Sequence, residues 1–339
     1  MATFAAMHGL EIYSTCPPFD AARAAPSAGR LREFARLSEE AGCTGALVVT
    51  DNGQLDPWLV SQQLLEASTR LAPLVAVQPV YMHPYSVAKM LASLAFLHGR
   101  RVHLNLVAGG FKHDLAALGD ATPHDERYAR LLEYATLVKR LLAAPQAVSF
   151  EGRYYSVTNL KLTPALRAEL QPALLMSGSS EAGAQAARQL GATAIEYPKP
   201  PEECAPGGGA RGLRIGIVAR DTEDEAWAVA RARYPEDRKG QLAHQLAAKV
   251  SDSVWHRQLS ERAARAAPPA RAAYWLGPFQ NYQAVCPFLV GSHAQVAQAI
   301  ARYVDAGYRT FILDVPAERE DLRHAGLAFE RAAAQALAA

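Results

Sequence analysis

A serine-rich turn in the middle of the chain has the residue types needed to bind an anion. Residues 174–181 read LLMSGSSE, which indicates a buried strand, a turn and the start of a helix. Gly178 permits a tight turn, and Ser179 or Ser180 can cap the helix and present hydroxyl and amide donors at its positive end. We therefore predict a phosphate site over Ser177–Ser180, with plain helix capping as the alternative.

The same turn allows two other interpretations. It does not match the GxGxxG dinucleotide pattern, because serines stand at the second and third glycine positions. Gly178–Ala182 also resembles a relaxed nucleophile elbow, with Asp314 and His324 following in the chain order of an α/β-hydrolase triad. Hydrolases of that class begin with antiparallel strands and carry an HGGG-type loop, and neither is found in this sequence.

Three further polar residues stand where predicted elements end or begin. Asn105 closes a buried run ahead of Val107-Ala108-Gly109, and its amide can reach a polar ring edge or satisfy its own turn. His124 and Tyr128 open the next predicted helix at i and i+4, so both can reach one ligand, although Tyr128 can equally pack in the core. The ten histidines form no HExxH or paired-ligand pattern, so we expect no metal.

The elements that position these residues alternate between strands and helices. Continuous apolar runs separated by helices are typical of a parallel sheet that is buried on both faces. Eight such runs favour a (β/α)8 TIM barrel, an α/β fold, over an open sheet, and active sites of such barrels lie where the strands end. The predicted strands are Leu10–Ser14, Ala46–Thr50, Leu74–Gln78, Val102–Val107, Leu174–Ser177, Thr193–Tyr197, Arg214–Ala219 and Thr310–Val315.

Two segments interrupt the alternation within what we take to be one domain over residues 1–339. Residues 148–162 read VSFEGRYYSVTNLKL and predict an inserted β-hairpin before the fifth strand. Residues 231–275 lie between the seventh and eighth strands, where the connection emerges on the active-site rim, so they are a candidate lid. Basic residues outnumber acidic ones there, so we expect any anionic substrate group to meet this segment. A solvated pair of amphipathic helices is the alternative.

Composition limits the class of function. The chain has 339 residues and a net charge of +2, which is too nearly neutral for nucleic-acid binding. Its four cysteines are far apart and show no metal or disulfide spacing, which favours a reducing cytoplasm. We find no signal peptide and no apolar run long enough to span a membrane. Small-molecule chemistry is therefore the expected function.

Taken in order, these motifs resemble one family. The end of the fourth strand, the HDERY helix start, the EGRYY hairpin, the SGSS turn and the run Val218–Trp227 occur in sequence here. The chain resembles the bacterial luciferase-like flavin-dependent monooxygenases, and most closely their alkanesulfonate and long-chain alkane branch. The resemblance implies a two-component enzyme, which takes reduced FMN (FMNH2) from a separate NAD(P)H:flavin reductase and oxygenates its substrate with dioxygen through a flavin peroxide. It also implies a homodimer or homotetramer.

The resemblance implies roles for individual residues. Ser177 and Ser180, with the Gly178-Ser179 backbone, fall on the FMN phosphate, Asn105 falls near the flavin ring, and His124 and Tyr128 fall beside the flavin. Gln54 stands where alkanesulfonate monooxygenases carry a cysteine, and Arg214 is retained where their neighbouring histidine is lost. Tyr282 stands in place of a lid-proximal arginine, and residues 316–318 lack their Tyr-x-His pair.

These differences predict a substrate other than an alkanesulfonate, because a buried sulfonate needs several cationic partners. We expect Gln54, Arg214, Tyr282 and Asn281 to line its pocket. Oxygenation at carbon, oxygenation at nitrogen and Baeyer–Villiger insertion all stay open. Two alternatives to the monooxygenase are a deazaflavin-dependent oxidoreductase and a flavin-binding protein that has lost catalysis.

Overall fold

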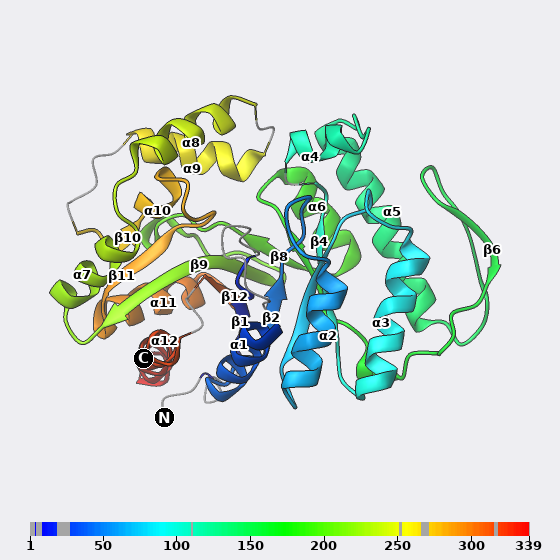
Figure 1. The fold of residues 1–339 in the computed structure, drawn as a ribbon, viewed down its shortest axis with the longest axis horizontal. Helices are drawn as coiled ribbons and strands as arrows, with labels where there is room; N and C mark the ends of the chain where they lie inside the picture. Colours follow the sequence, from blue (N-terminus) through cyan, green and yellow to red (C-terminus); the bar gives the residue numbers. More distant parts are fainter. Residues whose placement is uncertain are drawn as a thin grey trace.

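Eight parallel strands close into a barrel in the computed structural model, which describes residue 4 and residues 9–18, 28–109, 111–250, 253–265, 271–314 and 318–338. Each strand pairs in parallel with its neighbours, and the ring closes from the last strand to the first. The predicted (β/α)8 barrel is therefore confirmed (Figure 1). The barrel strands are β1 (Glu11–Thr15), β2 (Gly45–Val48), β3 (Ala72–Val77), β4 (His103–Val107), β7 (Leu174–Ser177), β8 (Thr193–Glu196), β9 (Arg211–Arg220) and β12 (Tyr308–Asp314).

The seventh barrel strand, β9, is longer than the sequence pattern predicted. Its first half pairs with β8 and β12, and from Gly216 to Arg220 it pairs in parallel with β11 (Phe288–Ser292). The two-residue strand β10 (Tyr274–Trp275) then pairs antiparallel with β11. Neither β10 nor β11 was predicted from the sequence.

Helices surround the barrel on its outer side (Figure 1). They are α1 (Ala28–Glu40), α2 (Pro57–Ala67), α3 (Pro84–His98), α5 (His124–Ala143), α6 (Glu181–Leu190), α11 (His293–Asp305) and α12 (Arg319–Ala338). The short helix α4 (Lys112–Ala117) lies at the rim of the barrel, between β4 and α5 (Figure 1). Strand β8 is followed only by the short 3-10 turn η3 (Pro201–Glu203). Prolines lack a backbone N–H donor, and they crowd residues 198–206, so no regular helix forms there.

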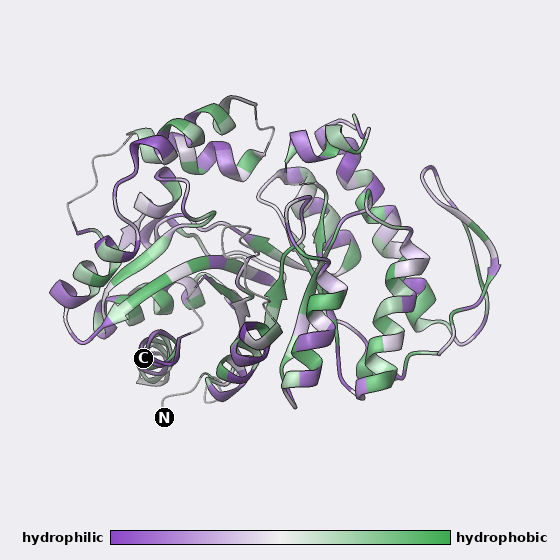
Figure 2. Cartoon of the chain, in the orientation of Figure 1, coloured by the Kyte–Doolittle hydropathy of each residue, from purple (hydrophilic) through white to green (hydrophobic). Residues whose placement is uncertain are grey.

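Apolar side chains fill both the inside of the barrel and the layer between strands and helices. Inside the barrel, Tyr13, Leu47, Leu74, Leu175, Ile195 and Ile312 form one buried cluster. The strands are accordingly hydrophobic over most of their length, whereas the outer helices alternate between hydrophobic and hydrophilic residues (Figure 2). This is the two-sided burial that the continuous apolar runs predicted.

The predicted hairpin is present as a separate two-stranded antiparallel sheet of β5 (Val148–Glu151) and β6 (Ser156–Leu160). Glu133 of α5 anchors its turn by accepting backbone N–H bonds from Arg153, Tyr154 and Tyr155, at 2.9, 2.8 and 2.6 Å. The hairpin lies beside α5, at the edge of the barrel (Figure 1).

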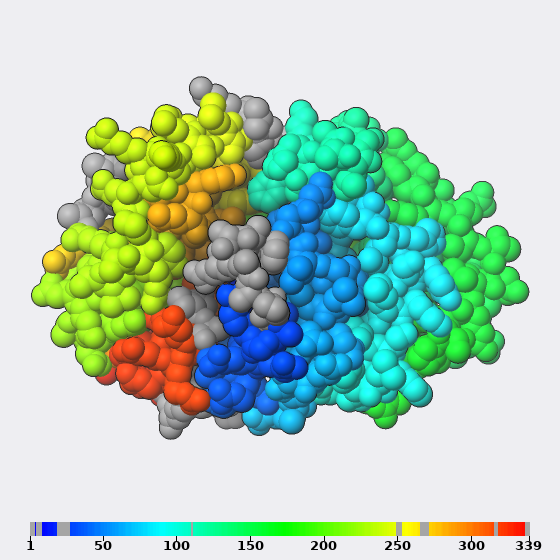
Figure 3. Space-filling model, in the orientation of Figure 1, coloured from blue at the N-terminus to red at the C-terminus, as the bar shows by residue number. Residues whose placement is uncertain are grey.

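The connection between β9 and β11 carries the predicted lid segment. It contains α7 (Glu223–Arg233), α8 (Arg238–Val250), α9 (Val254–Arg265), β10 and α10 (Gly277–Gln280). Residues 251–252 and 266–270 of the segment lie outside the described residues. In Figure 3 the yellow-green α7–α8 segment lies on the left of the face shown, and the teal α4 lies to its right.

Among the described residues, no helix is both long and apolar enough to cross a membrane.

Candidate functional site

A cavity of about 530 Å³ opens at the carboxyl ends of the barrel strands. Its size falls within the range of ligand pockets, and its position is the one that barrel enzymes use for catalysis. Apolar side chains such as Leu47, Val49, Ala76 and Val107 alternate with the amides Gln54, Gln78 and Asn105. The cavity therefore suits a ligand with large apolar faces and a few polar edges.

The serine-rich turn lies at this cavity, and Ser177, Gly178, Ser179 and Ser180 all line it. Ser180 caps α6, since its hydroxyl accepts the Gly183 N–H at 3.1 Å, and Ser177 donates its hydroxyl to Asn105 Oδ1 at 2.8 Å. The Ser179 hydroxyl accepts the Tyr197 N–H at 3.4 Å. The N-terminus of α6, with its partial positive charge, is thus held at the cavity wall.

Tyr128 packs directly against this turn. A Cβ atom built on Gly178 would lie 2.3 Å from the Tyr128 hydroxyl oxygen, and Gly178 has a φ of 154°. Only a residue without a side chain allows this approach. His124 lies one helical turn earlier on α5, with its ring 5.3 Å from that of Tyr128, and both residues line the cavity. The structure therefore brings together all the predicted cofactor-binding residues.

Arg127 is a cavity residue that the sequence analysis missed. It lies between His124 and Tyr128 in the first turn of α5, is 3% exposed, and donates from Nη1 to the Thr122 carbonyl at 3.2 Å. The HDERY motif contains it, and its position one turn after His124 could have indicated it. Its guanidinium places a buried positive charge at the same cavity as the α6 N-terminus.

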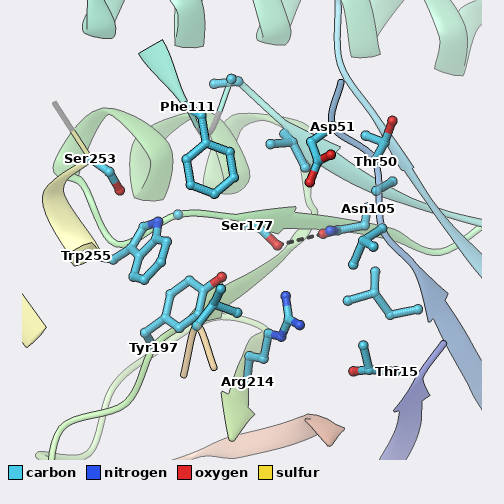
Figure 4. A pocket seen from close by; sticks show the side chains of 18 of the residues that line it. Thr15, Thr50, Asp51, Asn105, Phe111, Ser177, Tyr197, Arg214, Ser253 and Trp255 are labelled. Carbon is cyan, nitrogen blue, oxygen red and sulfur yellow. Dashed lines mark hydrogen bonds between the residues drawn. The ribbon is translucent and has the colours of Figure 1, made fainter. Parts of the chain in front are cut away.

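Arg214 reaches from β9 into the cavity, as Figure 4 shows. It pairs with Asp314 at the end of β12, with Nε and Nη2 at 3.2 and 3.0 Å from Oδ1. Burial by itself lowers the pKa of Arg214, but the Asp314 carboxylate outweighs that effect and raises the pKa above its usual value. Arg214 is therefore a permanent cation, and its charge is matched by a neighbouring carboxylate.

The lid segment closes over the barrel through an aromatic contact. Trp255 of α9 stacks on Tyr197, which follows β8, with ring centroids 4.0 Å apart and an interplanar angle of 17° (Figure 4). His244, His256 and Phe279 join α8, α9 and α10 behind this contact, with ring centroids 4.5 to 5.3 Å apart. Burial, and to a lesser degree His244, lowers the pKa of His256 to about 4, so the cluster is uncharged at neutral pH.

The prediction that the basic lid residues would meet an anionic substrate group is not supported by their positions. The described lid residues that line the cavity are Tyr234, Ser253, Val254 and Trp255, and none of them is charged. Outside the cavity, Arg233 pairs with Asp321, Arg262 with Glu203 and Arg271 with Asp224. Neither these arginines nor their acidic partners line the cavity, so their charges are matched outside it.

The predicted substrate-pocket residues divide into two groups. Gln54 and Arg214 line the cavity, whereas Tyr282 and Asn281 do not. Tyr282 follows α10 with a φ of 58° and is 50% exposed, and the cavity is reached instead by Gln283–Val285. The placement of Tyr282 in the pocket is therefore corrected, because the left-handed turn directs its side chain outwards.

Asn281 has a structural role in place of the predicted one. It is 4% exposed, donates to the Pro235 carbonyl at 3.1 Å and accepts from Gln241 at 2.9 Å. These bonds join α10 to the start of α8.

The α/β-hydrolase alternative is excluded by the closed parallel barrel and by the position of His324. His324 lies on α12, outside the cavity, and its Nδ1 is 2.8 Å from His293 Nε2. The other ring nitrogen of His293 lies 3.4 Å from Asp221, and the other ring nitrogen of His324 lies 2.8 Å from Arg323. Asp221, His293 and His324 lie close enough to be considered as metal ligands. In this structure the two imidazoles bond to each other, and their remaining ring nitrogens face Asp221 on one side and Arg323 and Glu320 on the other.

Fold and site together define a (β/α)8 barrel with a serine-capped helix N-terminus at the mouth of its cavity. The family model described as "Luciferase-like monooxygenase" matches residues 12–207. The chain is also 35% identical over 302 residues to the 4-(gamma-L-glutamylamino)butanoyl-[BtrI acyl-carrier protein] monooxygenase BtrO of Niallia circulans, covering 86% of this chain and 88% of that one. The chain belongs to the luciferase-like monooxygenase family.

Solved structures agree with this assignment at the level of the fold. A riboflavin lyase, RcaE, solved with modified FMN and riboflavin, has a TM-score of 0.75 at 18% identity, covering 95% of this chain and 91% of that one. The long-chain alkane monooxygenase LadA has a TM-score of 0.73 at 17% identity, covering 97% and 91%. The family model and the similarity to BtrO confirm the predicted resemblance to luciferase-like monooxygenases.

Proposed function

We propose that this protein is a two-component monooxygenase that uses reduced FMN and dioxygen. The observation that carries the proposal is the set of groups gathered at one side of the cavity wall, namely the α6 N-terminus, three serine hydroxyls, Tyr128 and Arg127. We refer to it as the phosphate-type site. A helix N-terminus with hydroxyl donors and one buried guanidinium is a donor set that fits a phosphate dianion. The BtrO similarity favours oxygenation over the deazaflavin-dependent alternative.

In this proposal Ser177, Ser179, Ser180 and Arg127 hold the phosphate, and Asn105 presents its amide to the ring edge. Reduced FMN, when bound, would supply the electrons that activate dioxygen for insertion of one oxygen atom into the substrate. The protein contributes binding, orientation and exclusion of water. In this proposal the contact between Trp255 and Tyr197, which both line the cavity, would help to exclude water on the lid side.

The proposed substrate is an organic molecule other than an alkanesulfonate. The similarity to BtrO makes an acyl group presented on a carrier protein the first substrate to screen. Gln54 and Arg214 would contact it, since both line the cavity. A separate NAD(P)H:flavin reductase would supply the reduced flavin.

Anaerobic titration with photoreduced FMN, followed by mixing with oxygen, tests the proposal. We expect reduced FMN to bind and an oxygen-dependent absorbance transient of the bound flavin to appear. Binding of reduced FMN with no transient would favour a flavin-binding protein without catalysis. Binding of a reduced deazaflavin in its place would favour the oxidoreductase alternative.

A matched pair of variants localises the cofactor. Ser180→Ala removes the N-cap of α6, whereas Ser292→Ala removes the N-cap of α11, which lies away from the cavity. Each should cost about 1 kcal/mol of stability. Only Ser180→Ala should weaken FMN binding, and equal effects of the two variants would contradict the phosphate assignment.

A further inference from the structure

Asp314 has not been assigned a role in the reaction, yet it lies on the cavity wall. Asp314 is opposite Gly216 in the β12–β9 register, and Arg214 is opposite Ile312. The two residues are therefore offset by two positions along the paired strands, and the arginine side chain spans that distance. The two side chains are 15% and 16% exposed, so this is a largely buried ion pair at the cavity.

Asp314 has a further partner. The fully buried Cys286 donates its thiol to Asp314 Oδ2 at 3.1 Å. Burial and the Asp314 charge hold the pKa of Cys286 well above its usual value, so the thiol keeps its proton and remains a donor. The carboxylate is thus fixed in place from two sides.

We propose that Asp314 is a specificity-determining residue, which neutralises Arg214 and thereby makes this end of the cavity select an uncharged polar group over a carboxylate or sulfonate. An anion placed here would either separate the buried pair or lie beside the Asp314 carboxylate. Separating a buried pair leaves an uncompensated charge, and like charges at short distance repel. A neutral amide, hydroxyl or carbonyl neither separates the ion pair nor is repelled by the Asp314 carboxylate.

The rest of the cavity offers little compensation to an anionic substrate. Among the described lining residues, Arg127 and Arg214 are the arginines, and no lysine lines the cavity. Arg127 belongs to the phosphate-type site. The inference rests on the proposed function only in taking this cavity as the substrate site.

Calorimetric binding of two probes of equal chain length, octanesulfonate and octanamide, to the flavin-free protein tests this inference. The titrations are made in phosphate buffer, so that inorganic phosphate competes for the serine-rich turn and Arg127. The wild type should bind octanamide at least about tenfold more tightly, because one like-charge contact costs more than the 1.4 kcal/mol that a factor of ten represents. Asp314→Asn should strengthen octanesulfonate binding by about tenfold or more. Arg214→Gln/Asp314→Asn, which removes both charges, should not show that gain.

Three results would overturn the inference. They are equal affinities of the wild type for the two probes, no gain in Asp314→Asn, and the same gain in the double variant. If Asp314→Asn alone does not fold, because Arg214 has lost its partner, the wild-type comparison and the charge-free double variant still decide. Failure of FMN to bind would count against the proposed function and would leave these flavin-free measurements unaffected.

Discussion

The contact between Trp255 and Tyr197 should control how often the lid segment opens. Trp255→Ala removes one ring of a stacked pair whose centroids are 4.0 Å apart. Such a pair contributes about 0.5–1.5 kcal/mol beyond its buried area. Loss of that energy raises the population of the open lid by about 2- to 13-fold, because each 1.4 kcal/mol is a factor of ten.

Native-state hydrogen exchange measures this opening directly. Amides of α9 (Val254–Arg265) should exchange about 2- to 13-fold faster in Trp255→Ala, while amides of the barrel strands should be unchanged. Trp255→Phe keeps an aromatic ring in the contact and is the conservative control. Tyr197→Leu should match Trp255→Ala, and combining the two should add little, because both remove the same interaction. Unchanged α9 exchange in Trp255→Ala, or fully additive effects, would refute the argument.

Three other predictions follow from the structure. Gly178→Ala should weaken FMN binding about tenfold or more, since its Cβ would lie 2.3 Å from the Tyr128 hydroxyl and overpacking costs about 1–3 kcal/mol. Adding Tyr128→Phe to Gly178→Ala should recover part of the FMN affinity in a fluorescence titration. No recovery would show that a clash with the Tyr128 hydroxyl is not the cause of the weaker binding. Burial lowers the pKa of His103 to about 4 from 6.5, so His103 contributes stability that is complete above pH 6.5 and is lost as the pH falls towards 4. Urea unfolding should show the wild type losing about 2 kcal/mol more than His103→Asn between pH 7 and pH 5, and equal losses would count against this. Asn281→Ala should weaken the join between α10 and α8 by about 1–3 kcal/mol and speed tryptic cleavage at Arg238 and Lys239, whereas unchanged cleavage would show that the join is not limiting.

The barrel could be predicted from the sequence because its signal is local. Each barrel strand is a short apolar run flanked by helix signals, and the closure of eight parallel strands follows from their number and burial. Strand β11 was missed because residues 288–292 read FLVGS, a short run that joins directly to a helix. Only its pairing with the second half of β9 shows that it is a strand.

The candidate site also contains residues that local sequence patterns predict and contacts that they do not. The serine-rich turn, Asn105, His124 and Tyr128 were found because strand ends and helix starts can be recognised from neighbouring residues. The pairing of Arg214 with Asp314 spans 100 positions, and the stack of Tyr197 with Trp255 joins two separate elements. No local pattern predicts such contacts. Tyr282 was misplaced because its backbone turns left-handed after α10, and that turn decides which residue faces the cavity.

The extended strand β9 separates two tasks that a barrel enzyme must combine. One half of β9 closes the barrel with β8 and β12, and the other half, beginning at Gly216, carries β11. The connection that contains the lid segment begins after Arg220, at the end of β9, and ends at Phe288, where β11 begins. Both of its ends are therefore fixed on adjacent strands of one sheet. Exchange of this segment between relatives would therefore alter the cavity wall and leave the closure of the barrel untouched. The segment can therefore be exchanged as a unit, in evolution or by design, because both of its ends are defined positions on adjacent strands.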